Sequence, residues 1–300
     1  MGEIEWLADR FEEHRARLRA VAYRMLGSLP EADDAVQDAW LRLSQSGPAQ
    51  IDNLGGWLTT VVARVCLNML RSRQTRGEEP LGVHLPDPVV SLAQERQPEE
   101  EALLADSVGL ALLVVLDTLA PAERLAFVLH DMFALPFEEI APMVGRTPAA
   151  ARQLASRARR RVKGTAIPAD PDVARQREVV DAFLAAARAG DFSALVAVLD
   201  PGVVLRIDAG AKRPRASMAI RGADAVATQA LSGLATALRS AQLHPALVNG
   251  AAGTVVTVRG RPVTVMGFIV TDGKIAEIDA IADPERVRRI TASVPAGGLT

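Results

Sequence analysis

The stretch that most constrains this chain runs from Phe137 to Lys163 and reads FEEIAPMVGRTPAAARQLASRARRRVK. Its apolar residues follow a helical period up to Gly145, where the chain must turn and a side chain would cause strain. Thr147 is a suitable N-cap, and Pro148 suits the first position of a second helix because its missing N–H is not needed there. The pattern predicts two helices joined by a tight turn.

The second of these helices is predicted to have one apolar face and one basic face. Its inward residues are Ala151, Leu154, Ala155, Ala158 and Val162. The outward side and its flanks carry Ala149, Arg152, Gln153, Ser156, Arg157 and Arg160. Residues 145–169 contain no acidic residue, which is the charge pattern of a phosphate-binding surface.

The outward face also carries groups that can read DNA bases. Small residues at Ala149 and Ala150 let the helix approach base edges, and Arg152 and Gln153 offer bidentate donors for guanine and adenine. Helix-turn-helix binding to duplex DNA is therefore predicted, through Thr147, Ala149, Arg152, Gln153, Ser156, Arg157 and Arg160. The competing interpretation is an amphipathic helix whose basic face is only solvated.

Composition limits the class of protein. With 300 residues, of which 49% are hydrophobic, the chain can form two or three domains with real cores. Its net charge is −2, so DNA affinity must come from local patches. The opening MGEIEWLADRFEEHR lacks the basic and apolar regions of a secretory signal, and no apolar run is long enough for a membrane span. A soluble, cytoplasmic protein is expected.

Cysteine and histidine usage gives no sign of a metal site. The single cysteine, Cys66, excludes an internal disulfide and a Cys-based zinc finger. The histidines, His14, His84, His130 and His244, are scattered without ligand spacing. No metal and no cofactor are expected.

Two helices are predicted before residue 46. The first runs from Phe11 to Leu26 and ends at Gly27. The second opens at Pro30 with PEADDAVQDAWLRL, whose acidic first turn complements the helix dipole. Its inward residues are Ala35, Ala39, Trp40 and Leu43, and its polar face, left for solvent or a partner, is Asp34, Gln37, Asp38 and Arg42.

A third helix is predicted from near Trp57, after a loop at residues 46–56, and reads WLTTVVARVCLNMLRSRQTR. Its expected buried side is Trp57, Val61, Val62, Val65 and Met69. Its outward stripe is Thr60, Arg64, Asn68 and Arg71, which runs into Arg73 and Arg76. Polar donors on a basic ridge suit a single strand whose bases are turned out, and an ordinary solvated face is the alternative.

Residues 75–105 read as an acidic, proline-punctuated spacer that is not expected to pack alone. Helices at residues 100–119 and 121–133 then complete the domain that ends in the helix-turn-helix.

These motifs together resemble a bacterial RNA polymerase sigma factor of the extracytoplasmic function group. The resemblance covers most of residues 10–163, through D-D-A-V-Q-D-A-W-L-R-L, W-L-T-T-V-V-A-R and the helix-turn-helix. It implies docking on the clamp helices of core RNA polymerase by Asp34, Gln37, Asp38, Trp40 and Arg42. It implies that the helix-turn-helix reads the −35 element, that the linker enters the RNA exit channel, and that the single-stranded −10 element lies along Thr60, Arg64, Asn68, Arg71 and Arg73.

The chain continues beyond the length of such a sigma factor. Helices are predicted at 175–189, 192–199 and 223–238, and strands at 203–208, 243–248, 254–258, 263–271 and 275–281. The last four strands are separated by the hairpin turn pairs Asn249-Gly250, Arg259-Gly260 and Asp272-Gly273. Helices followed by a meander predict an α+β domain with helices over one face of a curved antiparallel sheet.

This C-terminal pattern resembles the SnoaL-like branch of the nuclear-transport-factor-two-like cone fold. Sigma factors with such a tail share W-L-P-E-P, D-G-G-G-K and N-P-D-K-L, which here become residues 84–88, 208–212 and 283–287. The largest departure is His84 in place of Trp. The resemblance implies regulatory contacts by His84, Leu85, Pro86, Asp87, Pro88, Asp208, Gly210, Lys212, Asp283 and Pro284.

The sequence leaves alternative functions open. The leading hypothesis is a sigma factor tuned in cis by its tail and not an enzyme; its partners are core polymerase and promoter DNA, without a membrane. A helix-turn-helix repressor with a ligand-binding tail is the second. The third is a cone-fold isomerase or cyclase fused to a DNA-binding module, with Asp208, Lys212, His244 and Asp279 as candidate catalytic groups.

The expected domains follow from these readings. Two all-α domains, residues 1–75 and 106–165, flank the linker at 76–105, and a cone-shaped SnoaL-like domain covers 170–290. Residues 291–300 are expected to be disordered.

Overall fold

The computed structural model describes residues 3–45, 51–76, 83–92, 109–165, 169–234, 241–292 and 294. The chain divides into two compact units, Met1–Glu79 with Leu112–Ala166 and Pro80–Ala111 with Ile167–Thr300. The N-terminal helices and the helix-turn-helix thus share a unit, and most of the expected linker belongs to the other. The bounds of the five segments taken from the sequence stay predictions.

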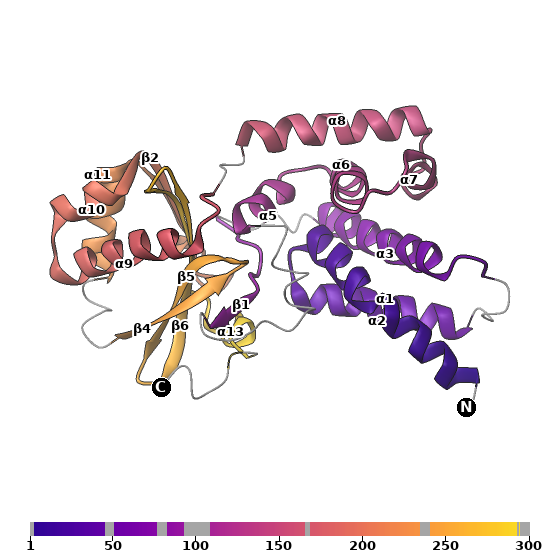
Figure 1. Ribbon diagram of the computed structural model, residues 1–300, viewed down its shortest axis with the longest axis horizontal. Coiled ribbons are helices and arrows are strands. Elements are labelled where there is room, and N and C mark those ends of the chain that lie inside the picture. Colours follow the sequence, from indigo (N-terminus) through magenta and orange to yellow (C-terminus); the bar gives the residue numbers. More distant parts are fainter. Residues whose placement is uncertain are drawn as a thin grey trace. The chain divides into compact units, whose positions relative to one another are not determined.

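The first unit begins with α1 (Glu3–Leu26), α2 (Leu29–Gln45) and α3 (Leu54–Arg76), packed against one another (Figure 1). Their apolar stripes form a core that includes Leu18, Met25, Leu43, Leu58 and Leu67. The α1 helix starts earlier than predicted, and α3 begins before Trp57, where the Asn53 side chain accepts a hydrogen bond from the Gly56 amide. Residues 46–50 of the predicted loop lie outside the described residues.

The same unit contains α6 (Pro121–Phe127), α7 (Phe137–Val144) and α8 (Pro148–Thr165), together with α5 (Leu110–Asp117) from Leu112 onward. The helix-turn-helix is confirmed. Gly145 has φ +68°, and Thr147 Oγ1 accepts a hydrogen bond from the Ala150 amide at 3.3 Å. The helix predicted over 121–133 widens into a π turn at Val128–Met132, and residues 100–108 of the preceding predicted helix lie outside the described residues.

A seam joins these two groups of helices within the first unit. Helix α6 packs on α3, and Arg124 Nε donates to the carbonyl of Arg24 at 3.0 Å. Both guanidinium groups are buried, at 2% exposure each. Arg17 donates to the carbonyl of Phe133 at 3.2 Å. The seam is therefore held by arginine side chains and backbone carbonyls as well as by apolar packing.

The second unit is built on a sheet with the order β1-β4-β5-β6-β7-β2-β3. Its strands are β1 (Val90–Leu92), β2 (Leu199–Asp208), β3 (Met218–Arg221), β4 (Ala241–Val248), β5 (Ala251–Val258), β6 (Arg261–Thr271) and β7 (Lys274–Ile281). All three predicted turn pairs have positive φ at both residues, which confirms the hairpins from β4 to β7.

Three features of the sheet were not predicted. Strand β2 pairs with β7 in parallel, and β3 extends that edge. Strand β1, which lies in the expected spacer, pairs with β4 at the opposite edge. Residues 83–92 of the predicted spacer do not pack alone but against the tail, which supplies the strand edge that a short segment cannot supply for itself.

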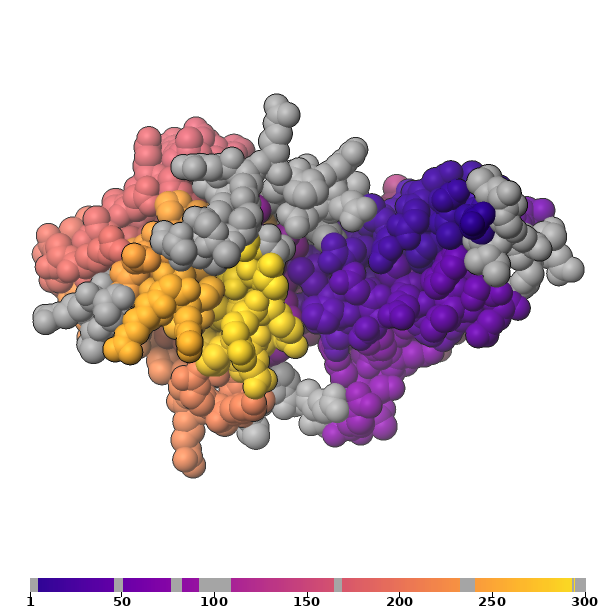
Figure 2. Space-filling model, turned by 90° about the horizontal axis from the view of Figure 1, so that it is seen from below, coloured from indigo at the N-terminus to yellow at the C-terminus, as the bar shows by residue number. Residues whose placement is uncertain are grey.

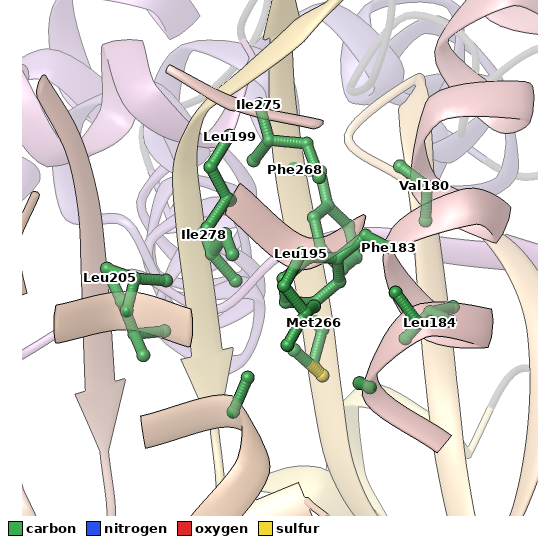
Figure 3. Close-up of a cluster of buried hydrophobic side chains, with 14 of the residues drawn as sticks. Val180, Phe183, Leu184, Leu195, Leu199, Leu205, Met266, Phe268, Ile275 and Ile278 are labelled. Atoms are coloured by element: carbon green, nitrogen blue, oxygen red, sulfur yellow. The ribbon is translucent and has the colours of Figure 1, made fainter. Parts of the chain in front are cut away.

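Helices α9 (Val173–Ala189), α10 (Phe192–Val198) and α11 (Ala223–Gln229) cover one face of this sheet (Figure 1). Their apolar side chains fill the space between helices and strands, with Phe183, Leu195, Met266 and Phe268 near the centre (Figure 3). The expected α+β class is confirmed. Helix α13 (Pro284–Ile290) was not predicted, and residues 293 and 295–300 of the expected disordered tail lie outside the described residues.

Candidate functional site

The second helix of the helix-turn-helix has the two faces that its sequence predicts. Ala151, Ala155 and Ala158 are fully buried, while Leu154 and Val162 are half-buried. On the other side, Ser156 is half-buried and the remaining predicted DNA-facing residues are exposed: Thr147, Ala149, Arg152, Gln153, Arg157 and Arg160. The helix therefore presents a basic surface on a rigid, packed element.

Neighbouring side chains hold the flanks of this surface in place. The Arg152 guanidinium lies over the Phe137 ring at 5.2 Å, which is a cation–π contact. Arg157 Nε donates to Glu123 at 2.8 Å, and Arg159 Nε to Asp131 at 2.7 Å. Sequence reasoning missed both acidic partners, because they lie about 30 positions earlier in the chain, on other helical segments.

The stripe predicted on α3 is largely exposed. Arg64, Asn68 and Arg71 face solvent. Thr60 is half-buried, and its hydroxyl donates to the carbonyl of Gly56 at 2.9 Å. Arg73 forms an ion pair with Glu31 of α2, so this arginine is tied to a neighbouring helix.

The polar face of α2 is exposed at Asp34 and Gln37, and Arg42 is paired with Asp38 at 2.8 Å. Trp40 is half-buried against Phe11, with ring centroids 5.2 Å apart. Leu41, which sequence reasoning did not select, is 48% exposed on this polar surface. The one feature of the sequence that could have identified Leu41 is its position outside the apolar stripe of the helix.

A groove of about 350 Å³ separates the predicted faces of α2 and α3. Its lining includes Asp38 and Arg42 from one helix and Asn68, Ser72 and Arg76 from the other. The two predicted binding faces are therefore adjacent within one unit, and a ligand on one can contact the rim of the other.

The structure brings the three altered tail signatures together at one place in the second unit. Asp208 Oδ2 accepts a hydrogen bond from the amide of Leu85 at 2.9 Å. Arg286 donates from Nε to Asp87 at 2.8 Å, from Nη1 to Asp208 at 2.5 Å and from Nη2 to the carbonyl of Leu85 at 2.5 Å. We call Leu85, Asp87, Asp208 and Arg286 the linker clasp.

Charge is buried in the linker clasp, so pairing controls its protonation. Burial alone raises the pKa of Asp208, but His84, the Leu85 amide and the charge of Arg286 outweigh burial and hold the pKa well below its ordinary value. The ring nitrogen Nδ1 of His84 lies 3.4 Å from Asp208 Oδ2, and His84 is half-exposed. The residue that replaces the expected Trp therefore contacts the clasp through a polar atom.

The other signature residues support the clasp. Asp283 caps α13 by accepting from the amides of Glu285 and Arg286, both at 2.9 Å, and Pro284 takes the first helical position. Gly210 has φ +81°, and a Cβ there would lie 1.8 Å from Asp283 Oδ2. Glycine is therefore required at this position on two grounds.

The linker continues from the clasp into strand β1. Pro86 and Pro88 are buried, the Val89 amide donates to Asn249 Oδ1 at 2.7 Å, and the Asn249 amide donates to the carbonyl of Val89 at 2.9 Å. Asn249 thus serves both as a turn residue and as a linker contact. Arg286 and Asn249 were both missed as contacts, although an arginine in a signature that contains acidic neighbours is a detectable signal.

The candidate catalytic groups of the tail are not brought together. Asp208 belongs to the linker clasp, Lys212 is exposed and pairs with Glu285, and His244 contacts the Thr257 hydroxyl at 2.9 Å. Asp279 is buried beside Glu277, and Arg206 donates to both carboxylates. Burial raises the pKa of Asp279 to about 6, against the opposing charge of Arg206.

The described residues contain neither a membrane-spanning helix nor a cluster of metal ligands. No helix there combines the length and apolar character needed to cross a membrane. No group of three or more His, Cys, Asp or Glu side chains in those same residues is placed to hold a metal ion.

Comparison with known proteins gives a consistent result. Residues 10–76 match the family model of Sigma-70 region 2, and residues 109–162 match that of Sigma-70 region 4. The ECF RNA polymerase sigma factor SigJ of Mycobacterium tuberculosis is 41% identical over 93% of this chain and 92% of its own length. The probable ECF RNA polymerase sigma factor SigI of the same species is 35% identical over 99% and 100%.

A solved structure agrees over the same length. The crystal structure of M. tuberculosis SigJ has a TM-score of 0.74 and 37% identity, and covers 93% of this chain and 97% of that one. The similarity therefore includes the C-terminal unit as well as the helical part.

Proposed function

This chain belongs to the extracytoplasmic function (ECF) family of RNA polymerase sigma factors, and on that premise we propose which residues carry the family's work. As a sigma factor, it binds core RNA polymerase and directs it to promoters through their −10 and −35 elements. The proposal assigns a face to each of these partners, assigns the tail a regulatory role, and places the protein in the cytoplasm, where the polymerase acts.

The −35 duplex is assigned to the exposed face of α8. Arg152 and Gln153 read base edges in the major groove, while Arg157 and Arg160 contact phosphates beside them. Thr147, Ala149 and Ser156 complete the surface at the helix N-terminus and along its middle. What supports this assignment is a basic face that is exposed along its length and backed by buried alanines.

The single-stranded −10 element is assigned to α3. Arg64, Asn68 and Arg71 are exposed in a line along the helix. Thr60 precedes this line in the sequence and Arg73 follows it. Arginines contact the phosphates and Asn68 contacts turned-out bases, so sequence preference depends on Asn68 more than on its neighbours.

Core polymerase is assigned to α2, through Asp34, Gln37, Asp38, Trp40 and Arg42. We add Leu41 to this set, since its aliphatic side chain is exposed among charges and can serve as the apolar centre of an interface. The neighbouring Trp40 packs on Phe11.

The two DNA faces cannot serve one promoter while the seam of the first unit is closed. Helix α8 packs on α6 and α6 on α3, which separates the faces by about 20 Å at the usual interhelical spacing. The elements at −35 and −10 lie about 25 base pairs apart, or roughly 85 Å along B-DNA. The seam therefore opens in the promoter complex, and two buried guanidinium groups, Arg24 and Arg124, limit the cost of opening.

The tail is assigned a regulatory role in cis and no catalytic role. Arg286 joins the tail to the linker between the two DNA-binding parts, and this is the observation that carries the proposal. Apolar side chains such as Phe183 and Phe268 fill the space between the helices and the sheet (Figure 3). A tail that grips the linker changes how far the DNA-binding parts can separate.

The test is transcription in vitro with core polymerase and a promoter of this sigma factor. Full-length protein is compared with Arg286→Met, which opens the linker clasp, and with Arg188→Met, an exposed arginine of α9, as the matched control. Transcript yield is expected to change with Arg286→Met alone. Equal yields from all three proteins contradict regulation through the clasp.

A further inference from the structure

One end of the tail carries a cluster of cations, and this cluster has no role in the assignments above. Residues 209–223 contain Lys212, Arg213, Arg215 and Arg221 and no acidic residue. In this they are like residues 145–169 around α8, which are also basic and contain no acidic residue. Helix α13 adds further arginines. We call Lys212, Arg213, Arg215, Arg288 and Arg289 the tail basic patch, and all five are exposed.

The two segments of the patch lie against each other. Lys212 Nζ is 2.5 Å from Glu285 Oε1, and Arg213 Nη2 donates to the carbonyl of Ala282 at 2.8 Å. Arg288 raises the positive charge near Lys212, which already pairs with Glu285. The patch is therefore one surface and not two separate charged stretches.

Apart from Glu285, which is exposed and pairs with Lys212, the acidic residues of this region are buried or engaged. Asp208 and Asp87 are 1% and 6% exposed, and both are bound by Arg286. Asp283 is occupied as the cap of α13. Arg213, Arg215 and Arg288 form no ion pair with any carboxylate in the described ranges. The linker clasp thus buries the carboxylates of Asp87 and Asp208, and the outer surface carries five cations against the one carboxylate of Glu285.

The patch is held on a rigid support. Helix α13 is anchored on β6 by buried Val287 and Ile290, and Figure 2 shows it, in yellow, on the surface of the second unit. Arg288 Nε donates to the carbonyl of Pro284 at 3.2 Å, which directs this side chain. Cations that are fixed before binding lose less conformational entropy when they meet a phosphate.

Fold stability does not explain the patch. Exposed ion pairs such as Lys212–Glu285 contribute little to stability because solvent screens them, and neighbouring cations repel one another. If the patch had no function, replacing some of these arginines with neutral residues would reduce the repulsion and stabilise the fold. A polyanionic partner removes the repulsion and gives the arrangement a use.

We propose that the tail basic patch binds the phosphate backbone of duplex promoter DNA, as a contact separate from those of α3 and α8. The proposal rests on promoter binding by the sigma factor and adds a third DNA-contacting surface to it. Guanidinium groups pair bidentately with phosphate, and the patch offers no side-chain amide that would read adenine. The contact is therefore independent of sequence and strengthens promoter binding at low salt.

The test measures the salt dependence of promoter binding by the holoenzyme, formed from full-length protein and core polymerase. The variant carries Arg213→Gln, Arg215→Gln and Arg288→Gln, and the matched control carries Arg175→Gln and Arg188→Gln, two exposed arginines of α9. The slope of log affinity against log salt is expected to flatten by about 2–3 for the patch variant and by less than about 0.5 for the control.

A second variant protects the test against misfolding. Arg215→Glu alone changes an exposed side chain that pairs with no described carboxylate, and it is expected to weaken promoter binding about tenfold at low salt. Slopes equal to wild type for both variants overturn the proposal. Transcription from the same promoter at low salt separates this result from a failure of the sigma function itself, which the α8 contacts maintain.

Crosslinking identifies the partner. A photoreactive residue at Ala216, which is exposed between Arg215 and β3, is placed in the initiating complex. Crosslinks to duplex promoter DNA support the proposal. Crosslinks only to nascent RNA or only to a polymerase subunit overturn it, because the phosphates of promoter DNA would then not be the ligand.

Discussion

Helices α8 and α13 carry almost the same four residues in different surroundings. Arg157-Ala158-Arg159-Arg160 lies in α8, and Arg286-Val287-Arg288-Arg289 forms most of α13. In both helices the second residue is fully buried, and the last is exposed. The first arginine differs: the Arg157 side chain is 51% exposed, and that of Arg286 is 13% exposed.

The difference comes from what lies over each helix. Arg157 meets one carboxylate, Glu123, at the edge of a surface open to solvent. Arg286 is covered by the linker and binds two buried carboxylates and a carbonyl. The same motif therefore supplies an exposed cation in one unit and a buried, paired cation in the other. Three predictions test this contrast, and a fourth tests a buried carboxyl group of the sheet, in order of decreasing expected effect.

The largest effect is expected for Arg286→Met. Two buried carboxylates lose their cation, so the free energy of unfolding of the second unit should fall by about 3–5 kcal/mol. Because the pKa of Asp208 is lowered in the folded state, its stabilising contribution is present above about pH 4 and is lost as the pH falls further. Urea denaturation at pH 7 and at pH 3 measures both effects.

The control for this prediction is Arg289→Met on the same helix. Its side chain is 57% exposed and lies 3.9 Å from Asp87, so a change below about 0.5 kcal/mol is expected. Equal losses from the two variants would mean that Arg286 acts through helix propensity or packing and not through the clasp.

A smaller effect of opposite sign is expected for Asp279→Asn. Because the pKa of Asp279 is raised to about 6 when folded, this carboxyl group stabilises the fold fully below about pH 4 and loses that contribution as the pH rises through 6. Asn should therefore raise the unfolding free energy at pH 7.5 by about 2 kcal/mol, with a gain that shrinks toward pH 4.

Thermal unfolding across this pH range is the measurement, with Asp181→Asn as the exposed control that should give a flat difference. Arg206 keeps Glu277 as its partner in the Asp279 variant. A variant that is less stable than wild type at every pH would show that Arg206 requires both carboxylates.

The exposed helix is expected to respond in binding and not in stability. Arg152→Ala should weaken binding of the −35 element by about 1–3 kcal/mol and change the unfolding free energy by less than about 0.5 kcal/mol. Quantitative footprinting with holoenzyme measures the first quantity. Arg161→Ala, on the flank of the same helix, should weaken binding to all sequences alike. Undiminished −35 occupancy with Arg152→Ala contradicts base reading at this position.

The smallest effect is expected for the ion pair of Arg157 with Glu123. Its arginine is half-exposed, so a double-mutant cycle with Arg157→Ala and Glu123→Ala should give a coupling of about 0.2–1 kcal/mol in stability. The coupling should weaken further at 1 M salt. A coupling as large as the loss from Arg286→Met would abolish the contrast between the two helices.

Local signals in the sequence predicted much of the fold. Gly145 and Thr147 fix the helix-turn-helix through backbone conformation and a cap, which depend on a few adjacent residues. Asn249-Gly250 and its two counterparts fix the hairpins in the same way. Along α8, the period of small residues correctly separates the buried face from the exposed one.

Contacts between distant residues escaped prediction. Strand β1 has three residues and no pattern of its own, and the parallel pairing of β2 with β7 joins strands far apart in the chain. Leu41 was missed because a helical period identifies the buried stripe but does not mark an apolar residue outside it as a binding residue. Arg286 was named only as part of a signature, because its linker partners lie about 200 positions away.

The sequence by itself determined the turn of the helix-turn-helix and the three hairpin turns, which family the motifs resemble, and which face of α8 carries positive charge. These properties depend on neighbours within a few residues. Only the tertiary structure decided that one arginine of a repeated motif is buried and the other exposed, that the linker adds a strand to the tail, and that acidic residues of the clasp face inward. Desolvation and pairing decide the role of a charged side chain, and both depend on which distant segment covers it.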